Sequence, residues 1–277
     1  MSTRAGRSIS KVRRPRGRLW VCLAAATTAA LAATPALAEL TQRGNIFISF
    51  KGGISPKALP REAPAPIAVR IEGRIRTPAG QEPPALRRIE IALHRGGRLN
   101  TNGLPRCRRA QIASADSAKA LAVCGKALVG SGGIVARNSF DDQVSSHVLR
   151  GGLLFFNARV KGRAAILAHL YQSHPVPTTS IIVFEIRRRG GTFGTEISAQ
   201  IPPSVNRNGY LKSIFLQLQR RYVHRGKRRA YLSAACAAPP GFPGATFPFA
   251  RASMTFEDGR TLSSTLVRSC RVRKGGS

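Results

Sequence analysis

Acidic residues are scarce in this chain of 277 residues, which has 12 Asp and Glu against 45 Lys and Arg and a formal net charge of +33. Aromatic residues make up only 6% of the chain, with a single Trp, which argues against a protein that stacks successive bases on aromatic rings. Hydrophobic residues reach 43%, and this excludes a disordered or collagen-like chain despite the charge. The length allows one large domain or two small ones, each with a hydrophobic core.

Long apolar runs are absent after the first 38 residues. Residues 1–38 contain seven cations and no acid. All seven cations precede the apolar run Leu19–Ala33, which is followed by the small-residue pattern Ala36–Ala38. This order predicts a signal peptide at residues 1–38 that is cleaved before Glu39, and therefore a secreted or extracytoplasmic protein, in solution or associated with the cell surface. An uncleaved anchor is the alternative, but an Ala-rich run is weakly hydrophobic for permanent residence in lipid. Cleavage would leave 38 cations and 12 acids, a charge of +26 on 239 residues with no transmembrane span.

The four cysteines that remain after cleavage predict two disulfides, because an even number in an exported chain is typical of a disulfide framework. Three pairings are possible, and we favour Cys107–Cys124 and Cys236–Cys270 because each closes the shorter loop. A metal site is the alternative, but no C-x-x-C spacing occurs and the nearest two cysteines are 17 residues apart. We expect no metal and no cofactor, with the histidines on the surface or in loops: His94, His147, His169, His174 and His224.

Apolar and polar residues alternate along most of the remaining chain, as in Ile67–Ile75, and this period of two predicts antiparallel strands separated by Gly-containing turns. Four prolines between residues 56 and 66 predict a Pro-rich N-terminal arm at residues 39–66, with a candidate strand at Asn45–Phe50. The segment 114–125 has capping residues and a Gly stop, which predict a short helix ending at Cys124 that plugs one end of a sheet. The predicted fold for residues 67–277 is all-β, an antiparallel β-sandwich of jelly-roll or immunoglobulin-like type or a flattened closed sheet, as one domain or as two sub-domains with a boundary near 137–147.

Several segments of the chain resemble a functionally uncharacterised group of exported proteins from high-GC actinobacteria. They are Gly103–Cys107, Ala122–Gly130, Leu154–Asn157, Pro175–Thr178, Gly191–Thr195, Tyr231–Cys236 and Gly241–Gly244. The resemblance covers most of the chain after residue 38 and implies export and disulfides, but it implies no activity, cofactor or catalytic residue. A high-GC source would also account for the excess of Arg over Lys.

Sequence signals for catalysis are weak, and we predict no catalytic residue. Neither a Gly-x-Ser-x-Gly elbow nor a phosphate-binding loop is present, and Gly130–Gly133 is typical of a turn or of a strand in close contact with another backbone. Adjacent acids, Asp141-Asp142 and Glu257-Asp258, fall in expected turns. Glu185 and Glu196 lie in expected strands on either side of an Arg-rich turn, where neighbouring arginines would pair with them. The alternative function is a secreted hydrolase whose site is assembled from distant strands, with one of these two acids.

Basic residues cluster around two expected turns at the ends of neighbouring strands, and these turns would form a cationic rim if both lie at one end of the fold. We predict an anion-binding surface that consists of Arg187, Arg188, Arg189, Arg220, Arg221, Arg225, Lys227, Arg228 and Arg229. Such a rim would attract anionic envelope polymers or polysaccharide and would not read a nucleic-acid sequence. Two alternatives stay open: Arg usage that reflects only a GC-rich genome, and a subunit or adhesion module with an exposed edge strand or apolar patch.

Overall fold

The computed structural model describes residues 39–138, 147–174, 176–206 and 209–273. The chain divides into two units, Met1–Pro35 and Ala36–Ser277, and all described residues belong to the second. The predicted signal peptide and most of the predicted sub-domain boundary near 137–147 lie outside the described residues.

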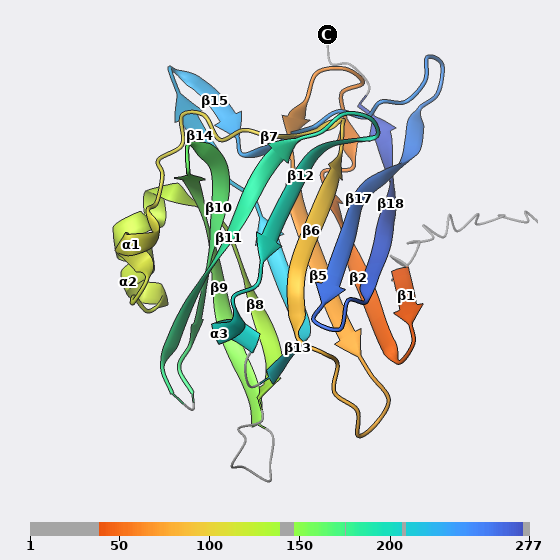
Figure 1. Cartoon of the computed structure of the whole chain (residues 1–277). Coiled ribbons are helices and arrows are strands. Elements are labelled where there is room, and N and C mark those ends of the chain that lie inside the picture. The colour runs from red at the N-terminus through yellow and green to blue at the C-terminus, as the bar shows by residue number, and fades with distance from the viewer. Residues whose placement is uncertain (1–38, 139–146, 175, 207–208, 274–277) are drawn as a thin grey trace, which may run out of the picture. The chain divides into compact units, whose positions relative to one another are not determined.

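Antiparallel strands dominate the described part of the chain, as the sequence predicted. Thirteen of these strands form one continuous sheet (Figure 1), in which neighbours are antiparallel except for β18 and β3. From edge to edge the order is β1 (Glu39–Arg43), β2 (Ile46–Ser55), β5 (Ala68–Arg76), β13 (Gly209–Leu218), β8 (Leu128–Asn138), β9 (His147–Val160), β10 (Arg163–Gln172), β11 (Thr178–Arg188), β12 (Phe193–Gln200), β6 (Leu86–His94), β17 (Gly244–Phe256), β18 (Thr261–Val272) and β3 (Ala58–Leu59).

Two smaller sheets accompany the large one. One is the hairpin of β14 (Arg221–His224) and β15 (Lys227–Ala230), and the other has the order β4 (Ala65–Pro66), β16 (Leu232–Ala234), β7 (Gly97–Leu99). The helical elements are short: α1 (Arg109–Ile112), α2 (Ser117–Cys124), the 3₁₀ turn η1 (Gly125–Ala127) and α3 (Pro203–Asn206). No helix among the described residues is long and apolar enough to cross a membrane.

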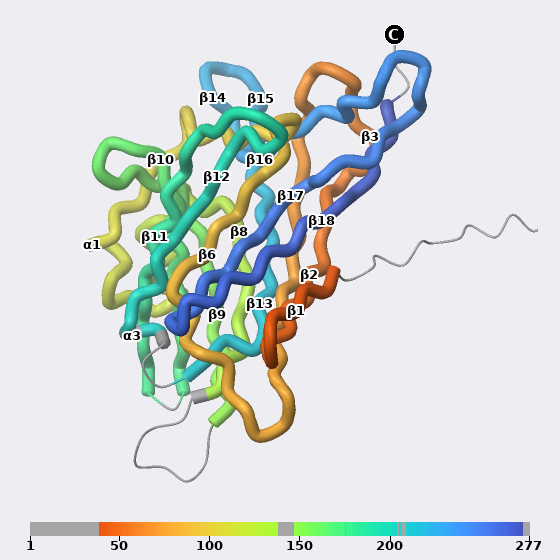
Figure 2. Tube along the Cα trace, turned by 45° about the vertical axis from the view of Figure 1, so that its right-hand side comes forward, coloured from red at the N-terminus to blue at the C-terminus, as the bar shows by residue number. Residues whose placement is uncertain are grey.

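The large sheet curls until β1 lies beside β18 (Figure 2), and side chains join these two strands. The carboxylate of Glu39 accepts hydrogen bonds from the backbone N–H of Val267, at 2.8 Å, and from the Arg268 guanidinium, at 3.1 Å. The Thr41 hydroxyl donates to the Ser263 carbonyl at 3.1 Å. Residues 39–55, which we predicted as part of an arm, therefore form β1 and β2 of the sheet itself.

The inner face of the curled sheet carries the main hydrophobic core. Alternation along β5 is typical: Val69 and Ile75 are buried in the core, whereas Arg70 and Arg74 are exposed on the outer face. Buried residues of β4 and β16 join the same core. The predicted disulfide Cys236–Cys270 is present and ties the segment after β16 to β18.

The helical segment covers the outer face of β9, β10 and β11, where we had predicted that it would plug an end of the sheet. Ile112 and Ala120 pack in a second core cluster with Phe156 and Leu167, and the second predicted disulfide, Cys107–Cys124, lies in that cluster. The Asp116 carboxylate caps α2 by accepting the Lys119 N–H at 2.7 Å. Strands β9 and β10 are thus buried on both faces, which explains their nearly continuous apolar sequence.

Candidate anion-binding surface

The antiparallel topology places four basic turns at the same end of the sheet. Strand β10 pairs with both β9 and β11, so the β9–β10 turn and the β11–β12 turn emerge at the same end. The β6–β7 connection joins them there, because the Arg95 N–H donates to the Thr192 carbonyl at 2.9 Å. Strand β13 runs toward the same end, since its last residue, Leu218, pairs with Gly130 of β8, which pairs with Phe155, five residues before the end of β9.

We call this end, consisting of residues 95–98, 159–163, 187–192 and 219–229, the basic end (Figure 1). These four segments contain fourteen cations and no acid, and every one of these cations except Arg220 is exposed. The connection 56–67 reaches the same end, because Ser55 pairs with Ala68 and Leu218 with Val69, and it adds two cations and the acid Glu62. Three turns at the opposite end, 43–45, 76–87 and 256–260, are nearly balanced, with four cations and three acids. The fourteen are Arg95, Arg98, Arg159, Lys161, Arg163, Arg187, Arg188, Arg189, Arg220, Arg221, Arg225, Lys227, Arg228 and Arg229.

The nine cations predicted from the sequence all lie at this end, but their strands are not neighbours. Strands β8, β9 and β10 separate β11, which carries Arg187 and Arg188, from β13 and the hairpin that follows it. Arg220 is half-buried and donates to the Lys126 carbonyl at 3.5 Å, so it contributes little to the exposed surface. The structure adds five cations to the predicted set, from the turns at 95–98 and 159–163.

Two hairpins at the basic end have a cation at the tip in a backbone conformation that L-residues seldom adopt. Arg225 and Gly226 have φ of 52° and 70°, and Lys161 and Gly162 have φ of 47° and 74°. Positive φ at both residues of a two-residue turn matches the twist of the flanking strands and normally selects Asn, Asp or Gly at the first position. A long cationic side chain at that position costs roughly 1 kcal/mol, and it projects the charge from the tip of the turn.

The β14–β15 hairpin is anchored on one face and open on the other. Tyr222 and His224 pair across the hairpin with Arg229 and Lys227. The Tyr222 hydroxyl donates to the Asn102 carbonyl at 2.8 Å, and the His224 ring lies against Gly103, where a Cβ would be 2.3 Å from it. Burial raises the pKa of Tyr222, which keeps the hydroxyl protonated as the donor of this bond.

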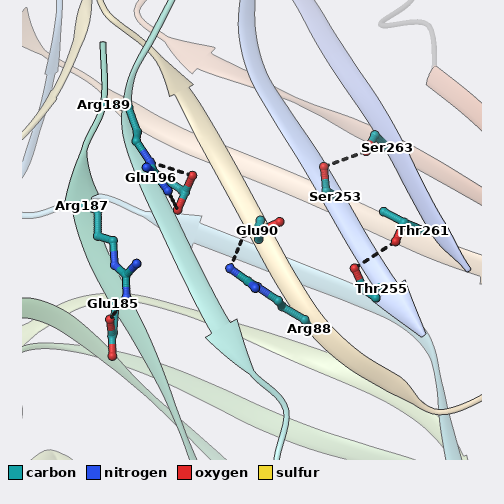
Figure 3. A network of polar contacts seen from close by, with 10 residues as sticks. All are labelled: Arg88, Glu90, Glu185, Arg187, Arg189, Glu196, Ser253, Thr255, Thr261 and Ser263. Carbon is teal, nitrogen blue, oxygen red and sulfur yellow. Dashed lines mark hydrogen bonds and ion pairs between the residues drawn. The ribbon is translucent and has the colours of Figure 1, made fainter. Parts of the chain in front are cut away.

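Carboxylates neutralise only two of the fourteen cations. Arg187 pairs with Glu185 at 2.8 Å and Arg189 with Glu196 at 3.0 Å (Figure 3). Among the described residues the other twelve form no ion pair. Burial, with a smaller contribution from Arg95, lowers the pKa of His94, so this histidine adds no charge to the basic end at neutral pH. The field at this end is therefore almost wholly positive.

The two acids proposed for a hydrolase have the structural role that the sequence favoured. Strands β11 and β12 form a hairpin, and each acid binds an arginine (Figure 3). The hydrogen bond from Arg187 lowers the pKa of Glu185, and the hydrogen bonds from Arg189 lower the pKa of Glu196. Both are ionised at neutral pH, so neither has the raised pKa that a general acid needs. Asp141 and Asp142 lie outside the described residues.

The histidines and the void near His94 add no second site in the part of the chain that the structure describes. His169 is fully buried, against our expectation of surface histidines, and its Nε2 lies 2.8 Å from the Ala115 carbonyl oxygen. No group of metal-ligating side chains occurs among the described residues. A void of about 30 Å³ near His94 and Leu232, inside the fold, has room for about one water molecule.

A scan against known protein families finds no match, and comparisons with curated proteins and with solved structures find none either.

Proposed function

We propose that the mature protein is a non-catalytic protein of the cell envelope or the extracellular space, held on anionic polymers by its basic end. The observation that carries this proposal is the segregation of charge. The four turns of the basic end have fourteen cations and no acid, while the turns at 43–45, 76–87 and 256–260 have four cations and three acids. Arginine usage set only by genome composition would not favour one end of the sheet.

Counterion release is the physical basis of the proposed binding. A polyanion releases condensed counterions when cations neutralise it, so affinity falls steeply as the salt concentration rises. Twelve cations without a carboxylate partner among the described residues are available for this exchange at the basic end. The alternative, a secreted hydrolase, is not favoured, because its two candidate acids are ionised and bound to arginine.

The test replaces the four cations of the β14–β15 hairpin and its tip, Arg225, Lys227, Arg228 and Arg229, by Ser. A matched control replaces four exposed cations outside the basic end whose side chains make no hydrogen bond or ion pair to any described residue: Arg76, Arg87, Arg106 and Lys119. Both variants have the same net charge. Elution from a heparin column and from washed cell envelopes is measured in a salt gradient.

We expect the hairpin variant to elute at clearly lower salt than the control variant. Equal elution of the two would show that total charge alone sets retention and would overturn the role of the basic end.

Two further expectations belong to this proposal: the jelly-roll or immunoglobulin-like type of the fold, and export with cleavage before Glu39 from a high-GC actinobacterium. The mass of the product recovered from the culture medium tests the cleavage.

A further inference from the structure

Two shallow hollows adjoin on the outer face of the sheet over β2, β5, β13, β8 and β9. Their volumes are about 590 Å³ and 390 Å³, and both include Glu72 in their lining. The two hollows thus adjoin at Glu72. We call the two together the sheet groove.

Glycines lower the floor of the sheet groove. The register brings Lys51, Glu72, Phe215 and Gly133 into one row across four neighbouring strands, so their side-chain positions all point to the outer face. Gly53 and Gly133 have no side chain to fill their part of that face. Phe215 lines the smaller hollow and is 37% exposed.

The walls of the groove are cationic and polar. Arg70 stacks over the Phe215 ring at 5.3 Å and donates to the Gln217 side chain at 3.3 Å. Arg74 and Arg150 line one hollow, and Lys51 and Gln219 line the other. The groove thus combines an aromatic ring, hydrogen-bonding amides and hydroxyls, and four cations around a single acid.

The spacing of the charges indicates the class of ligand. Arg70 and Arg74 are four residues apart on β5, about 13 Å along the strand, and Arg74 and Arg150 lie three strand spacings apart, about 14 Å. These are distances between backbone positions; two of the four cations line each hollow, so the positive charge is spread over both hollows and not gathered at one point. Glu72 in the middle of the row disfavours a polyanion whose charges follow one another closely, such as the phosphates of duplex DNA at about 3.4 Å along each strand. A polysaccharide with carboxylates separated by neutral ring faces fits both the spread cations and the exposed aromatic ring.

We propose that the sheet groove is a binding site for an acidic polysaccharide, in which Phe215 stacks on a sugar ring and the flanking Arg and Lys side chains bind carboxylates on either side. Its four cations are distinct from the fourteen of the basic end. Its binding would be more specific and less dependent on salt than that of the basic end, because ring stacking releases no counterions.

The experiment measures binding of polygalacturonate to the full mature chain by calorimetry at physiological salt. The first variant is Phe215→Ala, with Phe215→Tyr as the rescue and Phe242→Ala as the matched control. Phe242 is 61% exposed in the segment after β16, outside the groove. Because both phenylalanines are exposed, thermal melting of all three variants by circular dichroism is expected to stay that of the wild type. Two further ligands serve as controls. Methyl-esterified polygalacturonate has the same backbone without the charges, and single-stranded DNA has negative charges but not the chain of linked sugar rings.

We expect Phe215→Ala to weaken polygalacturonate binding about five- to tenfold, with Phe215→Tyr and Phe242→Ala close to wild type. The methyl ester is expected to bind more weakly than the acid. An unchanged affinity of Phe215→Ala overturns the sheet groove as a site, and tighter binding of single-stranded DNA with the same loss in Phe215→Ala overturns the polysaccharide assignment. The hairpin variant of the basic end separates the two proposals, since it would weaken retention on heparin and leave the effect of Phe215→Ala unchanged.

Discussion

Replacement of Gly132 by Ala tests a very close approach between two strands of the sheet. Gly132 of β8 lies opposite Leu216 of β13, and a Cβ built on it would be 2.0 Å from the carbonyl oxygen of Phe215 and 2.9 Å from the Leu216 Cα. Both neighbours are backbone atoms, so no side-chain rotation relieves the overlap. The strands have to separate locally by about 1 Å, which stretches an N–H···O bond of about 2.9 Å beyond the range of a hydrogen bond.

The expected cost has two sources, broken hydrogen bonds and steric overlap. Two ladder hydrogen bonds at about 0.5–1.5 kcal/mol each, together with about 1–3 kcal/mol of overpacking, give a loss of about 2–6 kcal/mol in the free energy of unfolding. For a domain of this size each kcal/mol lowers Tm by about 2–4 °C, so Tm should fall by at least about 4 °C.

The control is Gly125→Ala. Gly125 ends α2 with φ of −57°, and a Cβ there meets no described atom within 4 Å. Alanine at such a position restricts the unfolded chain and should raise stability by about 0.4–1 kcal/mol. Thermal and urea unfolding, followed by circular dichroism, measure both variants. A Gly132→Ala protein that melts within about 1 °C of wild type would show that β8 and β13 do not approach each other as described.

Three further predictions concern the disulfides, the β1–β18 contact and acid stability. Removing Cys107–Cys124 by Ala substitution should cost about 3.1 kcal/mol and removing Cys236–Cys270 about 3.8 kcal/mol, because loops of 17 and 34 residues are released. Urea unfolding with and without reductant checks which disulfide stabilises the fold more. A wild type whose unfolding does not change with reductant would contradict this prediction. Arg268→Ala should cost about 1.5–3 kcal/mol because it leaves the largely buried Glu39 carboxylate without its cation, and adding Glu39→Gln should recover part of the loss in Tm. Arg189 lowers the pKa of Glu196, so the stability from this pair is present above the ordinary carboxyl pKa of 4.5 and is lost as pH falls through the lower folded value. Glu196→Gln should therefore flatten the pH dependence of Tm below about pH 5. A pH profile of Tm identical to that of the wild type would exclude the pair as the cause of this dependence.

Local features of the fold were predictable from the sequence, because each depends on residues close together in the chain. The period of two identified the strands, the capping residue Asp116 and the Gly stop located α2, and loop length selected both disulfide pairs. The position of the helix was not predicted. The apolar runs Leu153–Phe156 and Ala164–Leu170 did contain a signal for it, since a strand with no polar side is covered on both faces.

Strand order was beyond sequence reasoning, because pairs such as β12 with β6 join residues about 100 positions apart and alternation does not specify a partner. The same limit applied to the candidate site. The two Arg-rich turns were visible as charge runs, but Arg95 and Lys161 look like isolated turn cations until the direction of each strand places them at the same end. In the sequence, Phe215 looks like an ordinary residue of an alternating strand. Only the register, which places it opposite Gly133, shows that it lines a hollow.

Unequal charge at the two ends of the strands gives the folded chain an electric dipole directed along them. Near a negatively charged wall such a dipole experiences a torque, which turns the basic end toward the wall before any contact forms. At physiological ionic strength the torque acts only within the last ~8 Å, the Debye length. The molecule would therefore settle with its strands upright, leaving the outer face with Phe215 at right angles to the wall and open to polymers that extend from it.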